Sequence, residues 1–414
     1  MTRLLSVLAA LLLTLAAAVW WLNVRGDADL AGTAPGASSP ALIERGAYLA
    51  RAGNCQDCHT PRGAAPYSGG RGIPTPFGTL YSSNLTPDAQ AGIGAWTSAE
   101  FRRALHNGRS RDGRLLYPAF PYDSYTRISA EDADALFAYL RSLPAVALPN
   151  RPHALRFPYD TQLALAVWRA LYFRPGRFEA DAAQPTEWNR GAYLVQGLGH
   201  CSACHAGRNA LGATRDPAAL AGGMIPLQNW YAPGLAGEPA PAVASLLQRG
   251  VSDSTALLGP MAEVVLHSTQ HLKPGDLAAM ALYLQSLPHP GAPPPRSDTP
   301  TPAQLKHGAD IYAARCAQCH GDEGQGRARA YVPLAGNRAV LRDPPANLVQ
   351  VVLGGAFPAS TADNPRPFGM PPFATELDDE DVAAVLSYIR NAWGNRGAAV
   401  QPLDVQRWRS SVRP

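Results

Sequence analysis

Apolar residues recur at intervals of three and four in three widely separated segments, residues 131–143, 276–287 and 379–393. In the first segment, Leu136 and Leu140 fall on one face of the helix that this spacing predicts. A tyrosine occupies the matching position of each segment, at Tyr139, Tyr283 and Tyr388. Because one pattern occurs three times, the chain is predicted to contain three copies of one structural unit.

A second, shorter helix is predicted at the start of each unit, in residues 44–49, 189–194 and 306–312. Each of these segments has a glycine at the same position, Gly46, Gly191 or Gly308. Since glycine has no Cβ, it lets two backbones approach closely. We therefore expect each opening helix to cross its closing helix at this glycine. The long interval between repeats indicates tandem domains and not a solenoid.

The N-terminal segment differs from the rest because it is an uncharged apolar run from Leu4 to Leu22. As a helix this run spans about 28 Å, close to the ~30 Å hydrocarbon core of a membrane. The alanines of residues 16–18 offer a cleavage site for a signal peptide, but Trp20 and Trp21 follow and are typical of a membrane interface. We favour an uncleaved membrane anchor over a cleaved signal.

These patterns divide the chain into an N-terminal anchor or signal peptide (1–26), a first domain (41–150), a connector (151–187), a second domain (188–288), a Pro-rich linker (289–302), a third domain (303–396) and a C-terminal tail (397–414). Residues 27–40 are typical of a flexible tether. Within the connector, residues 161–173 predict a short helix with an apolar face. We expect this helix to pack between the first two domains, and a membrane or a partner subunit is the alternative.

Composition adds two constraints. Charged residues make up 16% of the chain, below the ~25% of an average domain, while its 38 glycines and 39 prolines are unusually many. Small domains with long irregular loops fit this composition if a buried cofactor completes their cores. The formal net charge of +4 is too small to indicate a nucleic-acid partner.

The chemistry of the chain is concentrated in one motif, C-x-x-C-H, which occurs three times and uses all six cysteines. Its residues are Cys55, Cys58 and His59, then Cys201, Cys204 and His205, then Cys316, Cys319 and His320. This is the attachment signature of c-type haem, in which two thiols form thioethers and the histidine binds iron. Redox dithiols, zinc sites or three disulfides leave the repeated histidine unexplained. The sequence therefore predicts an all-α protein with three tandem cytochrome c-like domains, each with a covalently bound haem c, after the N-terminal membrane helix or signal.

Methionine often fills the second axial position of such an iron. Met370 and Met261 precede the closing helices of the third and second units and are our candidates for this position. Met224 is an alternative in the second unit, but it lies further from the expected place. Met280 falls inside a closing helix, where we expect it to pack in the core.

The first unit has no methionine between residues 41 and 150. Phe120, which cannot bind iron, stands in the expected place. The alternatives are His106, His153, a residue from another unit or a partner, and an open coordination position. For His106 we favour a solvated side chain near a helix end over a ligand. The hypothesis is that haem 1 differs from the other two haems in reduction potential or spin state.

Thioether attachment takes place outside the cytoplasm, so the motif also predicts export. With an uncleaved anchor the protein would lie on the periplasmic side of the inner membrane, and with a cleaved signal it would be free in the periplasm.

Beyond these motifs, the chain from residue 41 to about 400 resembles a known family, the triple-haem cytochrome c subunits of bacterial membrane-bound dehydrogenases. The segments that carry the resemblance include FGTLYSSNLTPD (77–88), LYPAFPY (116–122), residues 259–265 and 267–272, and FGMPPF (368–373). Such subunits serve alcohol, aldehyde, gluconate or fructose dehydrogenases, and a similar subunit serves molybdenum hydroxylases. The resemblance assigns the haem ligands to the three motifs, with Met261 and Met370 as distal ligands.

Two features depart from the alcohol-dehydrogenase type. Those subunits have methionine where this chain has Phe120, and Phe120 together with residues 154–159 is more similar to the molybdenum-hydroxylase branch. The second unit also lacks a segment equivalent to residues 92–96, which shortens the loop over haem 2.

The resemblance implies an electron-transfer subunit without substrate chemistry of its own. It would accept electrons from a dehydrogenase catalytic subunit of flavin, PQQ or molybdopterin type and pass them through three haems to ubiquinone or a terminal oxidase. A peroxidase-like haem enzyme with an open position on haem 1 is the alternative, and the missing methionine motivates it.

Overall fold

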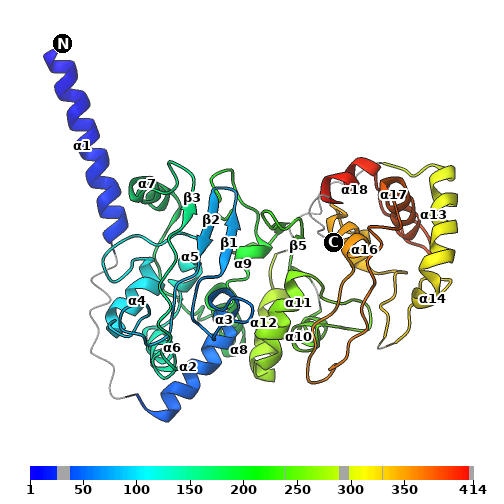
Figure 1. Ribbon diagram of the computed structural model, residues 1–414, viewed down its shortest axis with the longest axis horizontal. Helices are drawn as coiled ribbons and strands as arrows, with labels where there is room; N and C mark the ends of the chain where they lie inside the picture. Colours follow the sequence, from blue (N-terminus) through cyan, green and yellow to red (C-terminus); the bar gives the residue numbers. More distant parts are fainter. Residues whose placement is uncertain (26–37, 238, 289–297, 329, 410–414) are drawn as a thin grey trace. The chain divides into compact units, whose positions relative to one another are not determined.

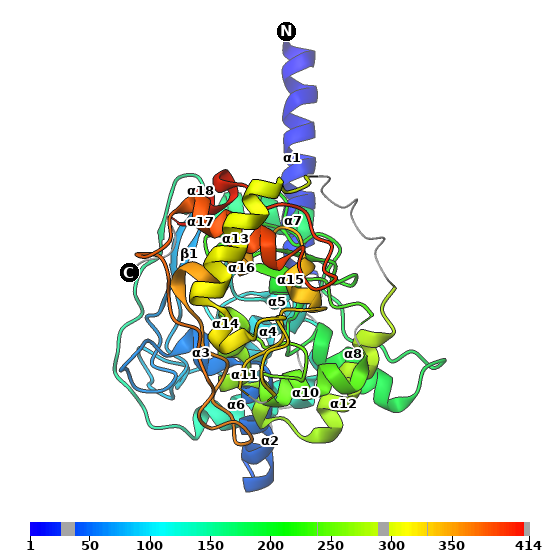
Figure 2. The same ribbon diagram turned by 90° about the vertical axis from the view of Figure 1, so that its right-hand side faces the viewer.

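The computed structural model describes residues 1–25, 38–237, 239–288, 298–328 and 330–409. Helices predominate and long loops join them (Figure 1; Figure 2). The chain forms two compact units, of which the first contains residues 1–203 and 210–213 and the second residues 204–209 and 214–414. The division falls within the second haem motif, so it cuts across the second predicted domain.

The first unit contains helices α1 (Thr2–Val24), α2 (Pro40–Ala52), α3 (Cys55–His59), α4 (Ser98–Asn107), α5 (Tyr122–Tyr125), α6 (Ala130–Arg141), α7 (Gln162–Tyr172) and α8 (Thr186–Gln196), with strands β1 (Gly72–Thr75), β2 (Gly78–Tyr81) and β3 (Ala154–Leu155). The short helix α9 (Ser202–His205) runs from the first unit into the second. Helix α7 confirms the helix predicted in the connector.

The second unit contains strands β4 (Gly222–Met224) and β5 (Tyr231–Pro233), followed by helices α10 (Ala240–Arg249), α11 (Pro260–His267), the 3₁₀ helix η2 (Thr269–His271), α12 (Pro274–Gln285), α13 (Pro302–Arg315), α14 (Ala317–His320), α15 (Arg338–Leu341), α16 (Ala346–Gly354), α17 (Asp379–Ile389) and α18 (Pro402–Arg409). Met280 is buried in α12, which confirms its predicted place in the core.

The opening and closing helices of the first and third repeats cross at glycine, as predicted. A Cβ at Gly46 of α2 would overlap the backbone carbonyl of Ala135 in α6, and one at Gly308 of α13 would overlap that of Ala384 in α17. Only glycine allows backbones this close. Helices α8 and α12 belong to different units, so the crossing at Gly191 stays a prediction.

Two small antiparallel sheets were not predicted. Strand β2 pairs with β1, where Ile73 lies opposite Leu80, and with β3, where Thr79 lies opposite Ala154. In the second unit, β4 pairs with β5. These strands contain two to four residues, too few to produce a period of two in the sequence. The fold is therefore rich in helix but contains a few strands.

Part of the predicted C-terminal tail packs on the third repeat. In α18, Val405 and Trp408 are buried in the same core cluster as Val382 and Leu386 of α17. Arg409 forms an ion pair with Asp379 at the start of α17. The helix therefore closes one side of this core.

We predict that Gly46→Ala or Gly308→Ala lowers the free energy of unfolding by about 1–3 kcal/mol, because the added methyl group forces two packed helices apart. The measurement is the midpoint of denaturant unfolding followed by circular dichroism. Gly275→Ala in α12 is the matched control, since no atom lies within 4 Å of the added Cβ. Equal effects at Gly46 and Gly275 would contradict the proposed role of the crossing.

Candidate haem sites

The first and third motifs each begin a new helical turn directly after an opening helix. Helix α2 ends at Ala52, Asn54 adopts a left-handed conformation with φ of 48°, and α3 begins at Cys55. In the third repeat, α13 ends at Arg315 and α14 begins at Ala317. Two cysteines three residues apart on one helical turn lie on the same side. This arrangement allows both thiols and the histidine that follows them to hold a single planar cofactor.

Each of the three motif histidines forms the same kind of hydrogen bond. Their Nδ1 atoms lie within hydrogen-bonding distance of backbone carbonyl oxygens, 2.7 Å for His59 and Ser83, 2.7 Å for His205 and Pro233, and 3.2 Å for His320 and Val332. A carbonyl oxygen only accepts, so each Nδ1 carries the proton and donates it. Each Nε2 therefore keeps the lone pair that a metal ligand needs.

Burial also keeps these imidazoles neutral. It lowers the pKa of His59, His205 and His320, and the bonds to Ser83, Pro233 and Val332 only partly oppose this effect. A neutral, oriented imidazole with a free Nε2 is the form that binds haem iron. The donor set of each motif thus fits haem c.

Three of the motif thiols differ from those of a redox dithiol. The structure forms no disulfide bond between the six motif cysteines. Burial raises the pKa of Cys55 to about 12, that of Cys316 to about 11, and that of Cys204 above its ordinary value. Redox dithiols instead depend on a lowered thiol pKa.

Aromatic side chains surround the first and third motifs. Tyr139, one of the matching tyrosines, packs its ring 6.0 Å from that of Tyr67, which lies near Cys55. In the third repeat, the ring of Tyr312 lies 5.6 Å from Tyr388 and 4.9 Å from Trp393. These clusters form apolar walls beside the motifs.

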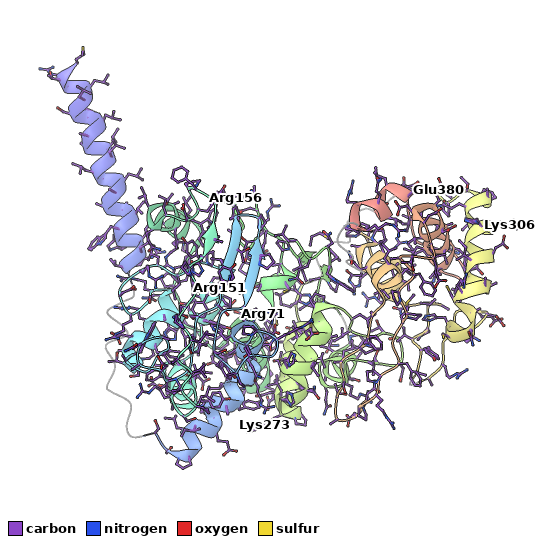
Figure 3. All side chains as sticks on the ribbon, viewed as in Figure 1. Arg71, Arg151, Arg156, Lys273, Lys306 and Glu380 are labelled. Carbon is purple, nitrogen blue, oxygen red and sulfur yellow. The ribbon has the colours of Figure 1, made fainter. Side chains whose placement is uncertain are left out.

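An ion pair holds the first motif from outside. The guanidinium of Arg71, which is labelled in Figure 3, lies 2.6 Å from the carboxylate of Asp57, one of the two residues between the cysteines. Arg71 also donates to the Asp57 carbonyl. Because Arg71 immediately precedes β1, this contact ties the motif to the three-stranded sheet.

Met370 lies in the same region of the second unit as the third motif. Its N–H donates to the Ala356 carbonyl at 2.8 Å, which fixes the loop backbone. The neighbouring Phe368 packs 5.3 Å from Tyr331, whose ring lies 6.5 Å from that of His320. A chain of aromatic contacts thus connects the methionine loop to the motif histidine.

The two other candidate methionines, Met261 and Met224, differ in exposure. Met261 is half-buried at the start of α11, two residues after Gly259, which packs against the ring of Trp230. Met224 is exposed on β4. Its exposure makes Met224 the weaker candidate for a distal ligand.

The first repeat has aromatic residues where the others have a methionine. Phe120 is half-buried, with its ring 5.4 Å from that of Tyr125, whose hydroxyl lies 3.5 Å from the Gly53 carbonyl just before Cys55. His153 is exposed, and its Nδ1 accepts a hydrogen bond from the Tyr81 N–H at 3.1 Å.

The interpretation of His106 as a solvated side chain is wrong. His106 is 3% exposed, because α4 turns it into the protein interior. Its Nε2 has no hydrogen-bond partner in the described part of the chain. Burial, together with the nearby cations Arg177 and Arg102, lowers its pKa to about 4.

His200 is a residue that the sequence analysis did not single out. It directly precedes the second motif, yet its ring packs 5.7 Å from Tyr125 of the first repeat. Its Nδ1 lies 2.8 Å from the Leu198 carbonyl. Its position next to Cys201 was the only signal in the sequence.

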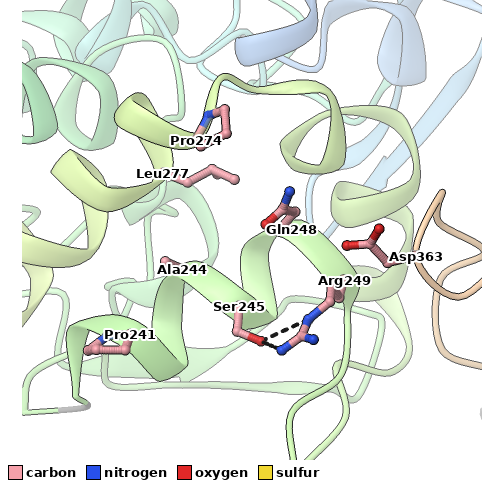
Figure 4. Close-up of a pocket in the computed structure, with 8 residues that line it drawn as sticks. All are labelled: Pro241, Ala244, Ser245, Gln248, Arg249, Pro274, Leu277 and Asp363. Carbon is pink, nitrogen blue, oxygen red and sulfur yellow. Dashed lines mark hydrogen bonds between the residues drawn. The ribbon is translucent and has the colours of Figure 1, made fainter. Parts of the chain in front are cut away.

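A pocket of about 330 Å³ lies elsewhere in the second unit (Figure 4). Residues of α10, α12 and a loop line it, among them Arg249, Leu277 and Asp363. It contains none of the motif residues, so it is separate from the candidate haem sites.

Comparison with known proteins agrees with this chemistry. Residues 43–144 and 305–393 match the cytochrome c family. Over 93% of its length, the chain is 38% identical to the cytochrome c subunit of a quinone alcohol dehydrogenase from Gluconacetobacter polyoxogenes and covers 88% of that protein. It is 36% identical to the gluconate 2-dehydrogenase cytochrome c subunit of Pantoea cypripedii, over 91% of both chains. It is also 38% identical, over 91% of its length, to a nicotinate dehydrogenase subunit from Pseudomonas putida, but covers only 32% of that protein.

We predict that His106 makes stability depend on pH between about 6.5 and 4. Since the folded protein lowers the pKa of His106, the unfolded chain binds the proton more readily, and stability falls as the pH drops through this window. The full effect is about 3 kcal/mol. Denaturant unfolding at a series of pH values should show this loss in the parent protein and a smaller one in His106→Gln. Parallel curves for the two proteins would contradict the assignment.

Proposed function

Because this chain belongs to the family of cytochrome c subunits of bacterial dehydrogenase complexes, we propose that it carries three covalently bound haem c groups and transfers electrons for such a complex. In this proposal, electrons enter from the catalytic subunit of a periplasmic dehydrogenase and leave to ubiquinone or a terminal oxidase. The chain itself has no substrate chemistry.

The observation that carries the proposal is the hydrogen bond from each motif histidine to a backbone carbonyl. It occurs in all three motifs, including the second, which lies outside the two segments matching the cytochrome c family. A structural histidine does not need the same tautomer at three equivalent positions. An axial ligand does, because only Nε2 can then face the iron.

We assign the thioether bonds to Cys55, Cys58, Cys201, Cys204, Cys316 and Cys319, and the proximal ligands to His59, His205 and His320. Met261 and Met370 are the proposed distal ligands of haems 2 and 3. Haem supplies one-electron chemistry when bound. The chain orients the imidazoles through the Ser83, Pro233 and Val332 carbonyls and excludes water with its aromatic walls.

Haem 1 is proposed to differ from the other two. Phe120 offers no ligand, and His153 is exposed with Nδ1 already bonded to the Tyr81 N–H. His106 is the buried nitrogen base of this repeat, and an open iron is the other alternative. Loss of a methionine ligand lowers the reduction potential. We therefore place haem 1 at a lower potential than haems 2 and 3.

The catalytic partner is proposed to be a dehydrogenase subunit of flavin, PQQ or molybdopterin type. Relatives that cover most of this chain are named as cytochrome subunits of alcohol, gluconate and fructose dehydrogenases, and one is part of a nicotinate dehydrogenase subunit. Phe120 favours the molybdenum-hydroxylase branch, and the gene adjacent to this one would identify the partner.

We further propose that α1 stays uncleaved as an anchor in the inner membrane, with the haem domains on its periplasmic side. By length and composition, its 23 residues are sufficient to cross a membrane.

A peroxidase-like haem enzyme remains the second candidate, because Phe120 leaves no methionine for haem 1. The two methionine-bearing repeats favour electron transfer. Peroxide-dependent turnover by the isolated protein would favour the enzyme.

We predict that Met370→Ala and Met261→Ala each lower the reduction potential of one haem and convert that haem from low spin to high spin, because the distal sulfur is lost. Redox titration and electron paramagnetic resonance of the oxidised protein measure both effects. Met224→Ala, which removes an exposed methionine, should change neither. If Met370→Ala leaves all three haem signals unchanged, the ligand assignment fails.

We also predict that the protein copurifies with a dehydrogenase catalytic subunit from detergent-solubilised membranes, since an electron-transfer subunit must dock on its donor. Mass spectrometry of the purified complex identifies the partner and its cofactor class. Recovery of a lone soluble monomer would argue against the subunit function.

A further inference from the structure

Helix α7 has two faces of different character. Its inward side chains Leu165, Arg169 and Ala170 are buried. Its outward side chains Leu163, Val167 and Leu171 are 74%, 42% and 55% exposed. The outward stripe contains no charge, because the only charged residue of the helix, Arg169, points inward. A helix face exposed to water normally carries charged residues, so this face indicates an apolar partner.

Arg169 fixes the rotation of α7. Its Nη2 donates to the Asn107 carbonyl at 2.6 Å, and its Nε donates to Oδ1 of Asn23 at 2.9 Å. The guanidinium also lies 4.7 Å from the ring centroid of Tyr122. A buried guanidinium held by these contacts cannot turn outward without losing all of them. The apolar stripe is therefore fixed on the outside.

Asn23 connects α7 to the N-terminal helix. Its Nδ2 donates to the Ala166 carbonyl of α7 at 2.9 Å, and Asn23 itself is buried. Figure 1 and Figure 2 both show α7 beside the C-terminal end of α1. The neighbouring Trp20 and Trp21 are exposed, as are the leucines along α1. Tryptophan is typical of the membrane–water interface, so α7 lies at the level of that interface if α1 spans the membrane.

We propose that the outward face of α7, formed by Leu163, Val167 and Leu171, lies in the interfacial layer of the phospholipid membrane that α1 crosses. A single spanning helix leaves a domain free to rotate about the helix axis. A second apolar contact beside it restricts that rotation and holds the first repeat against the membrane. The proposal depends on α1 as a membrane anchor and not on the electron-transfer function.

Lipid is the occupant that the structure favours. The stripe lies on a helix beside the exposed, apolar α1, and Asn23 holds the two helices together within one unit. An interfacial helix buries its apolar face among lipid chains. A protein partner or a second copy of the chain would also cover the stripe, and the experiment separates these outcomes.

The test uses the full-length haem protein in phospholipid vesicles with a nitroxide label at Val167→Cys. The native cysteines are proposed to form thioether bonds and should not react with the label. The parent protein, treated with the same label, tests for reaction at any other position. We expect the label to collide readily with oxygen, which dissolves in lipid, and rarely with a water-soluble nickel chelate. Glu44→Cys on α2 is the matched control and should show the reverse, because it is exposed and lies in the same unit at the end opposite α1 (Figure 1).

Three results would overturn the proposal. A label at position 167 as accessible to the nickel chelate as the one at position 44 would place α7 in water. A label shielded from both reagents would indicate a protein partner or a second copy. A mature protein that begins after α1 would remove the anchor on which the proposal depends. An unchanged haem absorption spectrum confirms that each labelled protein is folded.

Discussion

The hydrogen bond between Nδ1 of each motif histidine and a backbone carbonyl is the interaction on which the candidate haem sites depend. It connects each motif to a segment 24, 28 or 12 residues further along the chain. One bond thus fixes the orientation of the imidazole, selects its tautomer and ties that segment to the motif. Burial reinforces this, because it keeps each ring neutral.

Helix crossings and motif positions were predictable because their signals are local. Gly46 and Gly308 mark places where a side chain is missing, and the spacing of Cys and His is visible directly in the sequence. The carbonyl partners, such as that of Ser83, were not predictable, since backbone atoms have no residue-type signature. The pairing of β2 with β3 joins residues more than 70 positions apart in very short strands. The burial of His106 depends on tertiary packing that a polar residue near a helix end does not reveal.

The first repeat offers a haem different side chains from those of the other two repeats. Phe120 packs on Tyr125, and Tyr125 in turn packs on His200. The first repeat thus has aromatic rings at the position where the other repeats have a methionine. Loss of sulfur ligation would lower the reduction potential, and an apolar surrounding would offset part of this effect, since low polarity disfavours the extra charge of oxidised iron. The first repeat can therefore differ in potential without a change in its helices.

The raised thiol pKa values have a consequence for the order of assembly. In the folded chain, the raised pKa lowers the share of reactive thiolate at Cys55 and Cys316. The thiolate that a thioether bond needs would be more available while the motif is still exposed on an unfolded chain. Maturation would thus begin with the attachment of haem, and the closing helices would complete their packing around a cofactor that is already bound.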